Sequence, residues 1–231
     1  MSDKSLPAQS DKKAIDQFIH QVRTLPQGGA GQARLIFSLD ATASREATWD
    51  QASHLQSELF LATRDIGGLA IQLCYYRGYR EFKSTGFVRE TAQLLGLMNG
   101  VTCLGGITQI SRVLEHARDE TRAEPVRAVV FIGDCCEEPI DELCHIAGEL
   151  GMLRTPVFMF QEGGDPHAAA VFRQISKLSG GAYALFDRSS PQLLKDLLGA
   201  VAVYASGGVK ALRDHSQRSS SEVKRLTRQL R

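Results

Sequence analysis

The chain has 231 residues, of which 43% are hydrophobic and 23% are charged, as in one globular domain with a sizeable core. Its formal net charge of +1 excludes a whole-protein field that would draw in nucleic acid or an anionic membrane. The polar N-terminus lacks the apolar region of a secretory signal, and no apolar run reaches the ~18–20 residues that cross a bilayer. We therefore expect a cytoplasmic protein without a membrane span.

The first 32 residues predict an N-terminal extension to the main domain. Within residues 1–32, four apolar side chains fall on one face at helical spacing and indicate a short amphipathic helix: Ile15, Phe18, Ile19 and Val22. The following segment, LPQGGAGQ, contains one proline and three glycines and ends this helix.

Strands and helices alternate from residue 33 to residue 205. Five short apolar runs are nearly continuous, which is typical of parallel strands covered on both faces: 33–39, 69–76, 126–132, 156–160 and 182–186. The more polar segment 79–88 predicts a short edge strand or a hairpin arm beside the second run.

Apolar residues between these runs recur at helical spacing. They predict helices at 52–66, 110–117, 140–150, 171–178 and 191–201. Repeated strand–helix alternation predicts an α/β fold with a doubly wound, mostly parallel sheet. We expect one short antiparallel edge strand and helices on both faces of this sheet, in a domain that covers residues 33–205.

Residues 206–231 predict a basic and flexible C-terminal tail. From residue 209 onward, seven Lys and Arg stand against two acidic residues, which gives a local net charge of +5. Val223, Leu226 and Leu230 form one apolar stripe of a short basic helix within it. Any contact with nucleic acid is expected only through residues 209–231.

Five cysteines are present, and none of them forms a CxxC pair. Reduced thiols in a cytoplasmic protein are the simplest interpretation of this odd number. The alternative is a zinc site made of Cys135, Cys136, Cys144 and His145, although their spacing differs from that of known zinc pairs.

Three loops place oxygen-bearing side chains at one edge of the predicted sheet. Two of these loops follow the strands at 33–39 and 126–132, and the third contains Gly105-Gly106 and leads into a helix. Ligands of open α/β sheets bind outside the carboxyl ends of the strands, where such loops converge. The side chains are two carboxylates and three hydroxyls: Asp40, Thr42, Ser44, Thr108 and Asp134.

A set of carboxylates and hydroxyls suits a hard cation such as Mg²⁺ or Mn²⁺. Two carboxylates neutralise a divalent ion without closing its coordination shell. Waters and one external anionic oxygen can fill the remaining positions. The sequence therefore predicts an open magnesium or manganese site at this edge.

This arrangement resembles the metal-ion-dependent adhesion site (MIDAS) of von Willebrand factor A (VWA) domains. That family has Asp-x-Ser-x-Ser after its first strand, a Thr at the start of a later helix and an Asp after a central strand. Here the positions are Asp40, Thr42 and Ser44, then Thr108, then Asp134. The resemblance extends over residues 33–205 and implies a small stand-alone VWA-like domain. It also implies that a partner protein supplies an Asp or Glu carboxylate to the metal.

Four charged residues near the motif are candidates for an outer shell or a rim of the site: Arg45, Glu137, Glu138 and Asp165. Arg45 stands where many bacterial members of the family have Met, and it brings a positive charge toward the metal. Solvated loop charge is the alternative interpretation of the three acidic residues. Helix capping is likewise the alternative role for the hydroxyls of Thr42, Ser44 and Thr108.

An open oxygen site without an obvious nucleophile or general base favours a binding module. We expect a non-enzymatic protein that recognises an acidic group of a partner protein through a divalent metal. The first alternative is a magnesium-dependent phosphoryl-transfer or hydrolase enzyme, because an Asp at the end of a first strand is also the setting of aspartyl-phosphate chemistry. The second is a VWA scaffold whose basic tail contacts nucleic acid or a partner.

Overall fold

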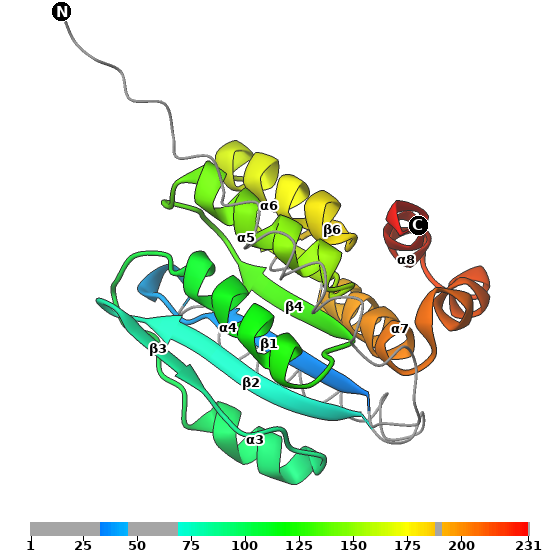
Figure 1. Cartoon of the computed structure of the whole chain (residues 1–231), viewed down its shortest axis with the longest axis horizontal. Helices are drawn as coiled ribbons and strands as arrows, with labels where there is room; N and C mark the ends of the chain where they lie inside the picture. The colour runs from blue at the N-terminus through cyan, green and yellow to red at the C-terminus, as the bar shows by residue number, and fades with distance from the viewer. Residues whose placement is uncertain (1–32, 46–68, 188–190, 231) are drawn as a thin grey trace, which may run out of the picture. The chain divides into compact units, whose positions relative to one another are not determined.

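A six-stranded sheet forms the centre of the fold (Figure 1). The computed structural model describes residues 33–45, 69–187 and 191–230, so the predicted extension at 1–32 and the predicted helix at 52–66 lie outside the described residues. The strands are β1 Arg34–Asp40, β2 Ala70–Arg77, β3 Glu81–Ser84, β4 Ala128–Gly133, β5 Val157–Glu162 and β6 Tyr183–Phe186.

The strand order is β3-β2-β1-β4-β5-β6, and only β3 runs antiparallel to its neighbour. This confirms the predicted doubly wound, mostly parallel sheet and its short antiparallel edge strand. Strand β1 is buried along its whole length between β2 and β4. The residue that ends β1, Asp40, therefore lies between the carboxyl ends of both neighbouring strands.

Helices cover both faces of the sheet, as the alternating pattern predicts. Helices α4 Ile110–Ala123, α5 Ile140–Met152 and α6 Pro166–Ser179 pack on one face. Helices α3 Thr91–Asn99, α7 Pro191–Gln217 and α8 Ser221–Gln229 pack on the other face. The sequence pattern did not predict α3, because only Leu94 and Met98 of this short helix are buried among the side chains described in it.

The C-terminal segment differs from the expected flexible tail. Helix α7 continues across residue 205 to Gln217, with a kink at Gly208, whose φ of 70° is readily adopted only by glycine. Leu212 of α7 and the predicted apolar stripe of Val223, Leu226 and Leu230 lie in the core. The physical reason is that burial of these apolar side chains offsets the polarity of the intervening SQRSSSE sequence.

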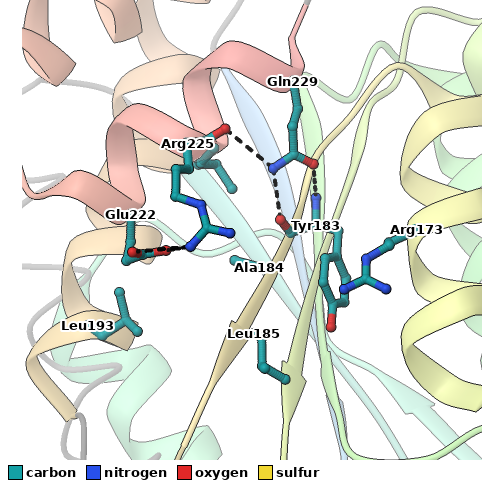
Figure 2. A pocket seen from close by; sticks show the side chains of 9 residues that line it. Arg173, Tyr183, Ala184, Leu185, Leu193, Glu222, Arg225 and Gln229 are labelled. Carbon is teal, nitrogen blue, oxygen red and sulfur yellow. Dashed lines mark hydrogen bonds and ion pairs between the residues drawn. The ribbon is translucent and has the colours of Figure 1, made fainter. Parts of the chain in front are cut away.

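Helix α8 also contacts the edge strand β6 through one side chain (Figure 2). Gln229 Nε2 donates to the carbonyl of Tyr183, and Gln229 Oε1 accepts from the amide of Tyr183, both at 2.9 Å. A side-chain amide thus occupies the position that the backbone of another strand would take. This pairing protects part of an exposed sheet edge.

In the described part of the chain, no helix combines the length and the apolar character that spanning a bilayer requires. Contact of residues 209–231 with nucleic acid stays a prediction. The basic side chains Lys224, Arg225 and Arg228 of α8 are all exposed, and Arg225 pairs with Glu222 at 3.1 Å.

The packing of α8 predicts the effect of a single truncation. Leu226 is 1% exposed, so Leu226→Ala is expected to lower the free energy of unfolding by about 2–4 kcal/mol through lost burial and a residual cavity. Lys224→Ala on the exposed face is the matched control, with an expected change within about 0.5 kcal/mol. Urea unfolding of both variants measures this difference, and equal effects would contradict the docking of α8.

Candidate metal centre

Asp40 is a fully buried carboxylate at the carboxyl end of β1. Its Oδ1 accepts a hydrogen bond from the amide of Thr42 at 2.8 Å. Its Oδ2 accepts one from the hydroxyl of Tyr76 at 2.9 Å, because Tyr76 is the register partner of Asp40 on β2. These two bonds fix the orientation of the carboxylate at the edge of the sheet.

Asp134 and Cys135 bring two further donors to Asp40 from the loop after β4. Their side-chain donor atoms and a carboxylate oxygen of Asp40 all lie within 4.8 Å of one another. Oδ1 of Asp134 is buried and has no hydrogen-bond partner among the described residues. Buried carboxylate oxygens are normally satisfied, so an orphaned oxygen beside a second carboxylate fits a bound cation.

The protonation of this cluster follows from burial and from like charge. Burial raises the pKa of Asp40 above its ordinary value, and the nearby charge of Asp134 adds to the effect. Hydrogen bonds from Thr42 and Tyr76 act in the opposite direction, but burial is the larger cause. Burial also raises the pKa of Tyr76 well above its ordinary value, with Asp40 the next cause, so Tyr76 remains a neutral donor at neutral pH.

Thr42 and Ser44 lie where β1 turns into the short 3-10 helix η1 Ala43–Arg45. The two hydroxyl oxygens are 3.1 Å apart, with Thr42 buried and Ser44 exposed. The Asp-x-Thr-x-Ser spacing thus brings the second and third positions of the predicted motif together. The side chain of Arg45 lies outside the described residues, so its predicted role stays a prediction.

The loop that contains Gly105 and Gly106 contacts the end of β1 through its main chain. The amide of Leu104 donates to the carbonyl of Ala41 at 3.1 Å, and Thr42 forms an isolated parallel bridge with Leu104. A Cβ at Gly106 would overlap the carbonyl oxygen of Gly78, whereas a Cβ at Gly105 would meet nothing within 4 Å. The close backbone approach that the glycine pair predicts is therefore required at Gly106.

Hydrogen bonds between Thr108 and Glu137 hold the loop that leads into α4 against the loop that carries Asp134. The amide of Thr108 donates to Glu137 Oε2 at 3.0 Å, and Thr108 Oγ1 accepts from the amide of Glu137 at 2.9 Å. Thr108 is 3% exposed. Its hydroxyl keeps its own hydrogen and a second lone pair for a further partner.

The predicted rim residues have structural contacts of their own. Glu138 caps α4 from a different loop, because its carboxylate accepts from the amides of Ile110 and Ser111 and from the hydroxyl of Ser111. Asp165 caps α6 by accepting from the amide of Ala168 at 2.6 Å. A rim or outer-shell role for Glu137, Glu138 and Asp165 stays a prediction beside these contacts.

Cys135 and Tyr76 contact the site although the sequence motif does not include them. Cys135 directly follows Asp134, and Tyr76 ends the apolar run that pairs with the first strand, so adjacency and register were the available signals. In the described part of the chain, Cys135 forms a group of potential ligands with Asp40 and Asp134 and not with Cys136, Cys144 and His145, so the alternative zinc cluster is not assembled there. The Cys136 thiol lies 3.9 Å from the carbonyl of Glu138, and the Cys144 thiol lies 3.2 Å from Gln174.

Comparison with known proteins identifies the fold. No family model matches the chain, and no curated protein matches it in sequence. Among solved structures, the SpRpn10 VWA domain is 12% identical with a TM-score of 0.60, and the match covers 73% of this chain and 94% of that one. A von Willebrand factor type A protein from Catenulispora acidiphila is 14% identical with a TM-score of 0.61, over 77% of this chain and 43% of that one.

A third similar structure is proximal thread matrix protein 1 from the mussel byssus, described with a zinc-occupied MIDAS motif. It is 16% identical with a TM-score of 0.60, over 75% of this chain and 46% of that one. Identities this low establish the architecture alone. The chain therefore has the fold of VWA domains, with the predicted MIDAS-like positions at the carboxyl edge of its sheet.

The contact between Gly106 and Gly78 predicts unequal effects of two neighbouring substitutions. Gly106→Ala is expected to lower the free energy of unfolding by about 1–3 kcal/mol, because the added methyl group overlaps backbone. Gly105→Ala has open space and is expected to stay within about 0.5 kcal/mol of the wild type. Urea unfolding compares them, and equal stability of the two variants would argue against this loop packing.

The raised pKa of Asp40 predicts how stability without metal depends on pH. Between the pKa of Asp40 in the unfolded chain and its raised pKa in the folded chain, the folded chain holds a proton that the unfolded chain releases. The wild type therefore loses stability as the pH rises through this interval. Asp40→Asn removes this loss and keeps an acceptor for the amide of Thr42. In EDTA, we expect the variant to melt at a higher temperature than the wild type at neutral pH, with the difference vanishing near pH ~4.

Thermal melting in EDTA across this pH range is the measurement. A wild type that stays the more stable protein at neutral pH would show that the ionised carboxylate stabilises the metal-free fold.

Proposed function

We propose that this protein is a divalent-metal-dependent interaction module that captures an acidic side chain of a partner protein. The observation that carries the proposal is the buried Oδ1 of Asp134, which no group in the described part of the chain satisfies, beside the buried carboxylate of Asp40. Two carboxylates this close repel each other without a cation between them. A bound divalent ion removes that repulsion and satisfies the orphaned oxygen.

The residues that would hold the ion are those of the predicted motif: Asp40, Thr42, Ser44, Thr108 and Asp134. Their oxygens suit Mg²⁺ or Mn²⁺. Two features support this set beyond the motif itself. The hydroxyls of Thr42 and Ser44 face each other, and Thr108 is joined to the loop of Asp134 through Glu137.

An Asp or Glu carboxylate of the partner is the proposed ligand, since an ion held by two carboxylates is electrically neutral and retains free coordination positions. The VWA fold supports an interaction role, because similar structures include a protein with an occupied MIDAS motif. A cytoplasmic location remains our expectation from the sequence.

Two properties of the site favour binding over phosphoryl transfer. Both oxygens of Asp40 accept hydrogen bonds within the fold, and its side chain is fully buried, so it is poorly placed to attack phosphorus. Burial and the two neighbouring carboxylates raise the pKa of the Cys135 thiol, so this thiol is a poor nucleophile in the absence of metal. We therefore propose a non-enzymatic role.

The proposal is tested by partner capture on immobilised protein from cell extract, in Mg²⁺ or in EDTA. We expect the wild type to retain a partner only in Mg²⁺, and Asp40→Ala to retain none in either buffer. The matched control is Asp141→Ala, which removes an exposed carboxylate on α5 and is expected to behave as the wild type. Circular dichroism verifies that all three proteins are folded.

A short competing peptide then tests the chemistry of recognition. A peptide with one central Asp is expected to lower capture in Mg²⁺, whereas the same peptide with Asn is not. Capture that is unchanged in EDTA would overturn the proposed function. Equal competition by both peptides would overturn the acidic ligand.

A further inference from the structure

We infer that Cys135 is an additional ligand of the bound ion and gives the site a preference for a thiophilic divalent cation such as Zn²⁺ over Mg²⁺. The inference rests on the proposed metal site and adds a donor that the oxygen motif does not contain. Its basis is the position of the Cys135 sulfur, which lies within 4.8 Å of carboxylate oxygens of both Asp40 and Asp134.

The fold fixes the position of this thiol. Cys135 follows Asp134 directly after β4, the strand that pairs with β1, and β1 ends in Asp40. The two neighbouring residues Asp134 and Cys135 therefore present their donors toward the same buried carboxylate. Cys135 is half-buried, so an ion can reach it from solvent while part of its surroundings excludes water.

The chemistry of the donors determines which ion is favoured. Soft thiolate ligands select zinc and similar metals, whereas magnesium prefers oxygen alone. On binding, the thiol releases its proton to solvent and a sulfur–metal bond forms. Asp40, Asp134 and Cys135 would then be the protein ligands of a four-coordinate zinc ion with one open position, whereas the hydroxyls of Thr42, Ser44 and Thr108 belong to the oxygen set proposed for Mg²⁺.

The identity of the ion also affects the proposed capture of an acidic group. With Mg²⁺, the two carboxylates balance the charge of the ion. With Zn²⁺, the thiolate adds a third negative charge, so a partner carboxylate is attracted less strongly.

Cys136 provides a matched control in the adjacent position. It lies in the same loop, but its sulfur is 3.9 Å from the carbonyl of Glu138 and does not belong to the cluster with Asp40 and Asp134. Substitution of serine for either cysteine replaces the side-chain sulfur with oxygen. Only the change at Cys135 should alter metal binding.

The test titrates Co²⁺, a spectroscopic substitute for zinc, into the wild type, Cys135→Ser and Cys136→Ser. We expect the near-ultraviolet sulfur-to-cobalt absorption in the wild type and in Cys136→Ser, and its loss in Cys135→Ser. Calorimetry is expected to show zinc affinity lowered by at least about tenfold in Cys135→Ser, since even indirect contacts to a metal have effects of this size. Magnesium affinity should be unchanged.

Persistence of the cobalt absorption in Cys135→Ser, or equal zinc affinity in all three proteins, would overturn the role of Cys135. A wild type that binds Mg²⁺ and Zn²⁺ equally without the absorption would contradict this inference alone. A wild type that binds no divalent ion would instead contradict the metal site on which the proposed function depends.

Discussion

A carboxylate buried at the end of a central strand is the constraint on which this end of the fold depends. Asp40 has no exposed surface, and it faces the carboxylate of Asp134, whose Oδ1 has no hydrogen-bond partner among the described residues. Such an arrangement is unfavourable in a hydrophobic core, because both burial and like charge oppose ionisation. The hydrogen bonds from Tyr76 and Thr42 offset only part of this cost.

The surrounding loops hold their places by contacts that are independent of any ion. Gly106 lies against the backbone of Gly78, and Thr108 exchanges two hydrogen bonds with Glu137. Glu138 caps α4 from the loop that follows β4. The edge of the sheet is thus organised by protein contacts alone, and a preorganised site would lower the cost of binding the proposed ion.

The sequence predicted the sheet well. Strands that are buried on both faces appear as continuous apolar runs, and the more polar segment at 79–88 indicated the edge strand β3. Helix α3 was missed, since few of its side chains are apolar and buried. The pattern predicts the apolar stripe of Val223, Leu226 and Leu230 but places it in a flexible tail, because the polar sequence before it gives no sign of the contact with the core that the structure shows. The sequence pattern indicates which residues can be buried, whereas tertiary packing determines which of these residues are buried in the fold.

The same distinction applies to the site. A motif of oxygen-bearing residues indicated Asp40 and Asp134, but the proximity of Cys135 depends on the direction of a single side chain after β4. The hydrogen bond from Tyr76 depends on strand register, and the capping role of Glu138 depends on how two loops meet. Adjacency to Asp134 and strand register point toward Cys135 and Tyr76, but residue spacing along the chain does not fix the direction of a side chain or the way in which two loops meet.

The central claim is that Asp40 and Asp134 share one divalent ion. A crystal structure of the protein soaked in Mn²⁺, with anomalous scattering recorded from the manganese, tests this claim most directly. We predict one strong anomalous peak between the two carboxylates, within coordination distance of the hydroxyls of Thr42 and Ser44. An absent peak, or a peak only at surface carboxylates such as Glu124 or Asp141, would contradict the claim.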